Sequence, residues 1–162
     1  MRPKAIFLII AISIPSKEYA QTPVDHSIAV KQGQVLEMHF DYPELIRVTT
    51  WEGSEVSVTG SASINQGEND DAFVLNNSSS GNTVRIRGEV SDIKKLPQRI
   101  TVVDGEKKMM FRDKAALQEY QETRGKSFEH MSWGPDIDIT LEVKVPRTMQ
   151  TRITSVYGMV EV

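Results

Sequence analysis

A strict alternation of apolar and polar residues limits this chain to β structure over much of its length. From Ile137 to Val145 every second residue is aliphatic, and the residues between them are Asp, Thr, Glu and Lys. Residues 83–90 repeat the pattern, with Val84, Ile86 and Val90 separated by charged residues. Successive side chains of a β-strand point to opposite faces of a sheet. Both segments therefore predict strands with one buried and one solvated face.

Shorter segments with the same period extend this prediction over residues 28–162. They lie at 36–40, 46–50, 56–58, 72–75, 149–156 and 159–162. The Asn- and Ser-rich residues 76–82 predict a turn that joins 72–75 to 83–90 as a hairpin. The sequence therefore predicts an all-β domain of antiparallel sheets in a sandwich-like arrangement.

Residues 91–135 depart from this pattern and predict an insertion. Asp104-Gly105 is a strong tight-turn signal between two β-rich runs, 100–103 and 107–111, which predicts an inserted β-hairpin. One short α-helix is expected to follow over 114–124. Asp113 is suited to cap its beginning and Gly125 to end it.

The first 20 residues have the features of a secretory signal peptide. Arg2 and Lys4 precede an apolar run at 5–14, which is shorter than the roughly 20 residues needed to span a bilayer. A cleavage point follows Ala20. The alternative interpretation is a buried amino-terminal strand. We expect residues 1–20 to be removed and residues 21–27 to form a flexible start.

Composition limits the compartment and the class of partner. The chain contains no cysteine, which excludes disulfides, thiolate zinc sites and a lipoprotein anchor. Its formal net charge is −3, and removal of the leader takes away more basic than acidic residues. An acidic surface argues against nucleic acid as a partner. We expect a periplasmic or secreted protein with no stable membrane span after signal removal.

The polar residues give no strong signal for a metal site. His26, His39 and His130 have no partners at metal-ligand spacing. The acidic cluster at 68–71 could bind calcium, but it lacks the ordered loop of an EF-hand and is better explained as a solvated turn. No metal or cofactor is expected.

Two carboxylates support one catalytic alternative. Asp136 and Asp138 share a face of their strand and, with Trp133, could serve glycoside hydrolysis. The simpler explanation is the solvated face of a sheet. The chain has no Gly-x-Ser-x-Gly motif and no Gly-rich phosphate loop. We therefore expect no catalytic residues.

Aromatic residues at turns are the strongest candidates for contact with a partner. Trp51 precedes a turn, Trp133 lies in an expected irregular loop at 131–135, and Tyr157 borders another turn. Such rings can stack on sugars or anchor a protein partner. The alternative is that they close the end of a β core.

Residues 136–146 lead through Val145-Pro146 into 153–162, where Tyr157-Gly158 precedes Val160-Glu161-Val162. This pattern, with Val30–Gln34, Ile46–Trp51 and Val56–Val58, resembles the amino-terminal part of putative-adhesin, β-strand-repeat proteins of unknown function from Bacteroidetes envelopes. The resemblance implies sheets that lead into a β-solenoid-like end with short Gly-punctuated rungs. It implies no catalytic residues. Because the chain stops where such rungs would begin, we expect a carboxyl-terminal truncation and an open edge strand capable of self-association.

Together these patterns predict a non-enzymatic, exported, β-rich interaction or structural protein of the bacterial cell envelope, adhesin-like by resemblance. Its partner is expected to be a protein or a glycan. Two alternatives stay open at this point. One is a carbohydrate-active enzyme that uses the paired carboxylates, and the other is a periplasmic regulatory or sensor partner.

Overall fold

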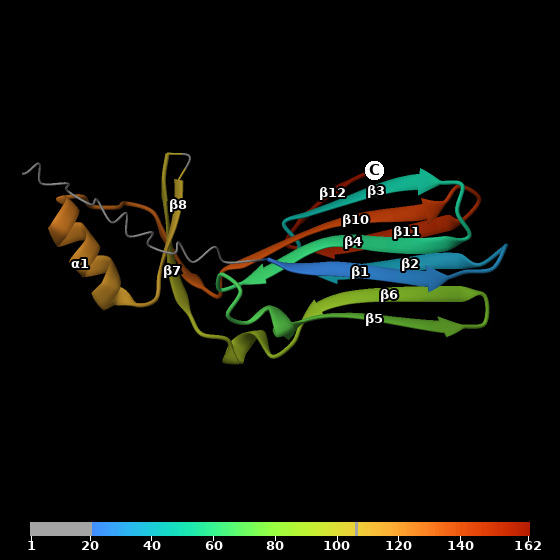
Figure 1. Cartoon of the computed structure of the whole chain (residues 1–162), viewed down its shortest axis with the longest axis horizontal. Helices are drawn as coiled ribbons and strands as arrows, with labels where there is room; N and C mark the ends of the chain where they lie inside the picture. The colour runs from blue at the N-terminus through green and yellow to red at the C-terminus, as the bar shows by residue number, and fades with distance from the viewer. Residues whose placement is uncertain (1–20, 106) are drawn as a thin grey trace, which may run out of the picture.

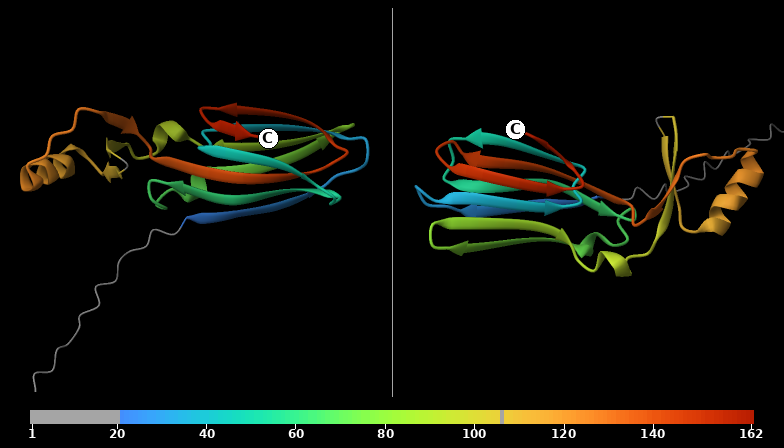
Figure 2. Two further views of the ribbon diagram at one scale, coloured as in Figure 1. Left: turned by 90° about the horizontal axis from the view of Figure 1, so that it is seen from above. Right: turned by 180° about the vertical axis from the view of Figure 1, so that it is seen from behind.

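Two β-sheets packed face to face make up most of the molecule in the computed structural model, which describes residues 21–105 and 107–162 (Figures 1 and 2). The expected signal peptide at 1–20 lies outside the described residues. The sandwich strands are β1 (Thr22–Ala29), β2 (Val35–Asp41), β3 (Leu45–Trp51), β4 (Glu55–Ile64), β5 (Phe73–Ser80), β6 (Thr83–Val90), β10 (Ile137–Pro146), β11 (Gln150–Val156) and β12 (Met159–Glu161). The predicted all-β class is confirmed.

Each sheet mixes antiparallel and parallel pairs. The first sheet has the order β1-β4-β10-β3-β12 and the second the order β11-β2-β6-β5. Antiparallel pairing, as predicted, joins β1 to β4, β4 to β10 and β5 to β6. The pairs β10–β3, β12–β3, β11–β2 and β2–β6 are parallel. Parallel pairs arise because the chain crosses between the two sheets after β1, β2, β4, β10 and β11, so most strands adjacent in sequence are not neighbours in a sheet.

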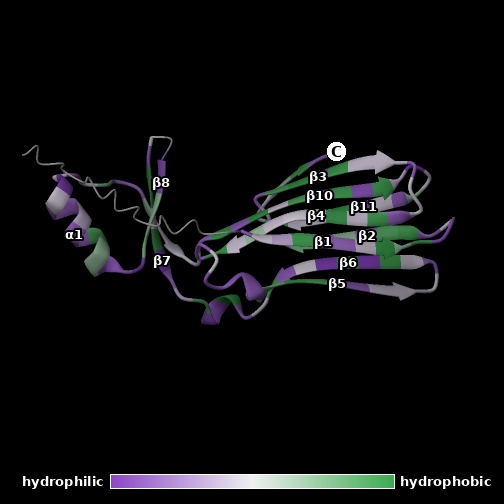
Figure 3. Ribbon diagram, in the orientation of Figure 1, coloured by the Kyte–Doolittle hydropathy of each residue, from purple (hydrophilic) through white to green (hydrophobic). Residues whose placement is uncertain are grey.

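The core lies between the two sheets and follows the predicted alternation. In β10, Ile139, Leu141 and Val143 are buried, while Thr140 and Glu142 face solvent. Leu36, Met38 and Phe40 of β2 meet them from the opposite sheet within one apolar cluster. Figure 3 shows the resulting mixture of apolar and polar segments along the strands.

The last two strands stack on β2 and β3 in parallel register. Gln150 to Val156 pair with Val35 to Asp41, and Met159 to Glu161 pair with Leu45 to Arg47. The two corners between the sheets therefore lie one above the other. A parallel layer of this kind agrees with the predicted beginning of a solenoid, but the solenoid itself is not confirmed.

Two segments of the sandwich differ from the sequence prediction, and both lie on edge strands. Residues 22–27 of the expected flexible start belong to β1, which pairs with β4 along its full length and buries Val24 and Ile28. The expected turn at 76–82 is shorter, because β5 continues to Ser80 with exposed polar side chains. An edge strand tolerates such residues because one flank and one face meet water.

The insertion forms a small sheet of its own beyond one end of the sandwich (Figure 1). Its strands are β7 (Arg99–Asp104), β8 (Lys107–Phe111) and β9 (Met131–Gly134), in the order β8-β7-β9. The expected hairpin of β7 and β8 is confirmed. The prediction of an irregular loop at 131–135 is wrong for residues 131–134, because these residues form a strand that pairs with β7. Short 3-10 helices at Asp70–Ala72 and Ile93–Lys95 lie in the connections.

Helix α1 (Lys114–Arg124) has the predicted bounds and caps. The Asp113 carboxylate accepts the N–H of Ala116 at 2.9 Å, and Gly125 ends the helix in a left-handed conformation with φ of 61°. Leu117 packs on Ile100 and Val102 of β7 in a second, smaller core. The buried side of the helix therefore lies on the inserted sheet.

We predict that Ile139→Asp or Leu141→Asp unfolds the protein. Each side chain is 1% exposed, and an unpaired carboxylate at that depth costs several kcal/mol, a large part of a typical domain's stability of about 5–15 kcal/mol. Thermal melting followed by circular dichroism measures the effect. Thr140→Asp, on the solvated face of the same strand, is the control and should melt close to wild type. A wild-type melting curve for either core variant would contradict the observed register.

We also predict that acid weakens the amino-terminal cap of α1. The hydrogen bond from Ala116 holds the pKa of Asp113 below its ordinary value of 3.8, with a smaller contribution from Arg112. Because the folded-state pKa is the lower one, the stabilisation is complete above pH 3.8 and is lost as the pH falls through the folded-state pKa. The NMR shift of the Ala116 amide should change in that range for wild type and stay constant in Asp113→Asn. An equal change in both proteins would exclude this carboxylate as the cause.

Candidate functional site

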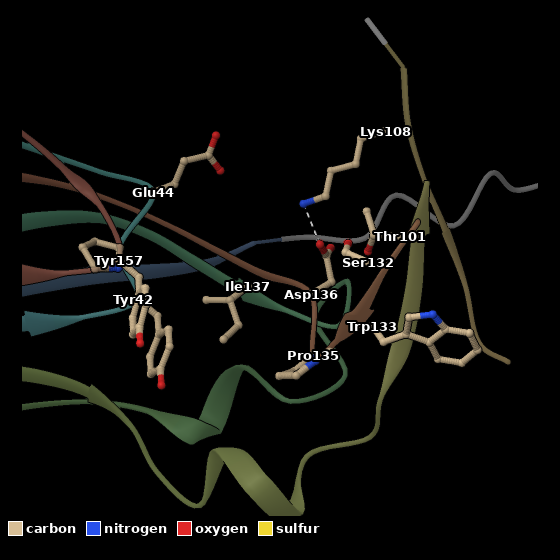
Figure 4. Close-up of a pocket in the computed structure, with 12 residues that line it drawn as sticks. Tyr42, Glu44, Thr101, Lys108, Ser132, Trp133, Pro135, Asp136, Ile137 and Tyr157 are labelled. Atoms are coloured by element: carbon tan, nitrogen blue, oxygen red, sulfur yellow. Dashed lines mark ion pairs between the residues drawn. The ribbon is translucent and has the colours of Figure 1, made fainter. Parts of the chain in front are cut away.

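A cleft of about 440 Å³ lies where the inserted sheet meets the end of the sandwich (Figure 4). Four parts of the chain line it: the corner between β2 and β3, the inserted sheet, the segment that enters β10, and the corner between β11 and β12. The lining residues are Tyr42, Pro43, Glu44, Thr101, Lys108, Ser132, Trp133, Gly134, Pro135, Asp136, Ile137 and Tyr157.

Asn65 connects the sandwich to the floor of this cleft. Its backbone N–H donates to the Asp136 carbonyl at 2.8 Å, and its side-chain oxygen accepts the Asp136 N–H at 2.9 Å. Its side-chain nitrogen donates to the Pro97 carbonyl and to Asn69. Asn65 is fully buried with φ of 52°, a left-handed conformation that asparagine tolerates better than most residues. These hydrogen bonds position Asp136.

Asp136 places a mostly buried carboxylate in the cleft. Its carboxylate is 16% exposed and forms an ion pair with Lys108 of β8 at 2.5 Å. Glu44, Thr101 and Ser132 add further polar atoms to the lining. The cleft therefore offers hydrogen-bond donors and acceptors around an ion-paired carboxylate.

A pair of stacked tyrosines forms the opposite wall of the cleft. The rings of Tyr42 and Tyr157 are 5.3 Å apart and tilted by 9°. Both residues have left-handed backbones, with φ of 57° and 61°. Gly158 allows the corners to approach, because a Cβ at this position would overlap the Pro43 carbonyl. Tyr157 is 79% exposed, so its outer face is available for contact.

Trp133 borders the cleft, but its ring points away from the tyrosines (Figure 4). The register explains this orientation. Trp133 pairs with Ile100, so both side chains lie on the face of the inserted sheet that packs under α1, while Ser132 and Thr101 share the cleft face. The indole is nevertheless 63% exposed at the end of β9.

Trp51 does not belong to this site. It lies at the far end of β3 from the cleft, where its indole N–H donates to the Glu55 carbonyl at 3.0 Å and its ring covers Gly53. The ring is therefore partly buried against the turn between β3 and β4. Of the three predicted contact residues, the structure brings Trp133 and Tyr157 to one cleft.

The residues considered for catalysis or metal binding are dispersed. Asp136 lines the cleft, whereas Asp138 is not one of the residues that line it. His39 pairs with Asp41 at 3.0 Å on the outer face of the second sheet, and His26 is exposed on β1. Over residues 21–105 and 107–162, no three His, Asp or Glu side chains are placed to hold a metal ion.

The acidic cluster at 68–71 is only partly the solvated turn that the sequence predicts. Asp70 is buried, and its carboxylate accepts the Ile64 N–H at 2.6 Å and the Thr22 hydroxyl at 2.7 Å. Glu68 forms an ion pair with the buried Arg99. These carboxylates hold β1 and the insertion against the sandwich. Sequence reasoning missed this role, as it missed that of Asn65, because both depend on partners distant in the chain.

No protein-family model, curated protein or solved structure matches this chain. In the part of the chain that the structure describes, every helix is too short or too polar to cross a membrane.

Proposed function

We propose that this chain is an exported, non-enzymatic interaction protein of the bacterial cell envelope, periplasmic or secreted and adhesin-like. In this proposal the cleft between the sandwich and the insertion binds a protein or glycan partner. The observation that carries it is the exposed Tyr157, stacked on Tyr42 beside the charged and hydroxyl groups of the cleft.

The tyrosine pair is suited to contact because it is already ordered. Its two rings stack on each other. Both tyrosines have left-handed backbones, and they directly follow the paired strands β2 and β11. A ring that is held in place before binding loses little conformational freedom when a ligand contacts it. A tyrosine also offers an apolar face together with a hydroxyl, a combination that suits sugars and protein surfaces.

The polar groups of the cleft favour recognition over hydrolysis. Glycoside hydrolysis by two carboxylates requires both to flank one bond. Of the two carboxylates considered for hydrolysis, Asp136 is paired with Lys108, and Asp138 does not line the cleft. An ion pair of this kind can orient a ligand through its remaining lone pairs and protons. These features support a binding protein more than the carbohydrate-active enzyme considered from the sequence.

We predict that Tyr157→Ala weakens binding to the cleft partner by about tenfold or more, the usual effect of removing a central aromatic contact. Residues 21–162 are tested by biolayer interferometry against immobilised envelope oligosaccharides and envelope proteins. Val103→Ala is the matched control, because Val103 is also an exposed hydrophobic residue, 60% exposed, but lies outside the cleft. Equal effects of the two substitutions, or no partner among these ligands, would contradict the proposal.

Export has its own test. Expression of the full chain with a carboxyl-terminal tag in a Gram-negative host should give a product shortened by about 20 residues outside the cytoplasm. Replacement of Arg2 and Lys4 by glutamate removes the positive start of the leader and should keep a longer product in the cell. Cell fractionation with mass spectrometry measures both. An uncleaved cytoplasmic wild-type product would refute export.

A further inference from the structure

The outer face of the second sheet carries a shallow trough of about 260 Å³ over strands β6, β2 and β11. Two register rows of side chains form its walls. The backbone of Met38 and Ile86 lies between the walls, because the side chains of these two residues point into the core. One wall consists of Arg85, Glu37 and Arg152, and the other consists of Arg87, His39 and Thr154.

Positive charge exceeds negative charge along this trough. Arg85, Arg87 and Arg152 line it together with a single carboxylate, that of Glu37. Glu37 lies 3.0 Å from Arg85 and 3.5 Å from Arg152, so it is shared between two arginines. The whole chain, by contrast, has a formal net charge of −3. The trough is therefore a basic patch on an acidic protein.

The arginines of the trough are oriented, but they keep donors for another acceptor. The Nε of Arg85 donates to Glu37 at 3.0 Å, and the Nε of Arg87 donates to Glu89 at 2.7 Å. A guanidinium group has five N–H donors in a planar fork, so a bond through Nε leaves its terminal nitrogens for a second partner. A terminal nitrogen of Arg87 lies 3.9 Å from Asp41, which is too far for a hydrogen bond. Because exposed ion pairs of this kind are weak, an added anion can compete with them.

Neutral hydrogen-bonding groups extend both walls. Ser78 of β5 pairs with Arg85 and Asn76 pairs with Arg87, so a hydroxyl or an amide lies beside each of these arginines. Thr154 adds a hydroxyl at the other end of the second wall.

The face around the trough lacks the anchors that other macromolecules require. In the described part of the chain, none of the large hydrophobic residues that are exposed lies on β2, β5, β6 or β11. A stable protein interface, including one with a second copy of this chain, has an apolar core. Single-stranded nucleic acids stack their bases on exposed aromatic rings. A face with charged, hydroxyl and amide groups alone is better suited to sugars.

The trough belongs to the face of the sheet and not to its edge. Its side chains project away from the core, and β2 and β6 are inner strands with a neighbour on either side. A further strand beside β11 would extend this face and would leave the walls over β2 and β6 in place. The site therefore does not depend on how the edge of the sheet is covered.

We propose that this trough binds an anionic glycan, a polysaccharide whose sugars carry carboxylate or sulfate groups. The acidic group accepts hydrogen bonds from the terminal nitrogens of Arg85 and Arg87, and the sugar hydroxyls bind Asn76, Ser78 and Thr154. The two arginines are two residues apart on one strand, roughly 7 Å, a span that a sugar ring with its acidic substituent can bridge. Pairing with a planar guanidinium gives affinity and orientation together. This site goes beyond the proposed function, because it is separate from the cleft.

The first test compares charged and neutral polysaccharides. Residues 21–162, which contain both apolar cores, are passed over immobilised polygalacturonate, dextran sulfate and neutral dextran in surface plasmon resonance. At least one of the two anionic polymers should bind about tenfold or more tightly than dextran, because charge-assisted hydrogen bonds are lost with the neutral polymer. The two anionic probes separate a carboxylate ligand from a sulfate ligand. Equal binding of dextran, or no binding of either anionic polymer, would overturn the proposal.

Poly-L-glutamate tests whether charge alone explains the binding. It carries carboxylates but no sugar hydroxyls, so Asn76, Ser78 and Thr154 gain no partners from it. We expect it to bind about tenfold more weakly than the preferred glycan. Equal binding would overturn the choice of a glycan in favour of an acidic polypeptide.

Substitution of the arginines locates the site. Arg85→Gln and Arg87→Gln should each weaken binding of the preferred glycan by about tenfold. Arg47→Gln is the matched control, since Arg47 lies on the outer face of the first sheet and forms an ion pair with Glu161. The three arginine side chains are similarly exposed, at 53%, 58% and 57%. Circular dichroism verifies that all variants are folded. An equal loss in the control, or no loss in the two trough variants, would contradict the assignment.

Arg87→Lys separates a built site from long-range attraction. Lysine keeps the positive charge but lacks the planar fork of the guanidinium group. This variant should therefore bind the preferred glycan more weakly than wild type. Full wild-type affinity would show that the geometry of Arg87 is not used and would overturn the proposal.

Two further outcomes separate this inference from the proposed function. Tyr157→Ala should leave the anionic glycan bound, since Tyr157 lines the cleft and not the trough; loss of binding in this variant would place the glycan in the cleft and overturn the inference. Arginine-dependent glycan binding without any Tyr157-dependent ligand would support the inference while the cleft proposal fails. Concentration-dependent dimerisation in sedimentation experiments, abolished by Arg85→Gln, would identify a second copy as the occupant and overturn the choice of a glycan.

Discussion

The pairing of β10 with strands on both sides holds the rest of the structure together. Its residues pair antiparallel with β4 and parallel with β3, and its aliphatic face supplies the middle of the main core. The same strand begins at the cleft and continues into the stacked β11 and β12. A shift by one residue would exchange Ile139 and Leu141 for Thr140 and Glu142 in the core. The cleft and the open edge both depend on this register.

Local signals account for the elements that could be predicted from the sequence. The alternation in β6 and β10 depends only on neighbouring residues, and so do the cap at Asp113 and the stop at Gly125. The structure places all of them as predicted. The parallel order of the sheets was not predicted, because it depends on where the chain crosses between layers. Strands β1 and β9 were missed because each is ordered by a partner strand rather than by its own pattern.

In the candidate site, too, some features could be predicted from neighbouring residues, whereas others depend on residues that are distant in the chain. Trp133 and Tyr157 stood out as aromatic residues near turns, and both border the cleft. The direction of the Trp133 ring depends on its pairing with Ile100, which no local pattern reveals. The role of Asn65 could not be predicted, because its partners Pro97 and Asp136 lie far along the chain. Position near a turn was predictable, whereas side-chain direction required the register.

The long separation between paired strands has a consequence for when this protein can fold. Arg47 and Glu161 pair across 114 residues of sequence, and β3 obtains its neighbours only from β10 and β12. Folding slows as contacts join residues that are more distant in the chain. Neither sheet can be completed until the last segment has been synthesised. Both sheets therefore close late, and their inner strands stay unpaired for longer during folding.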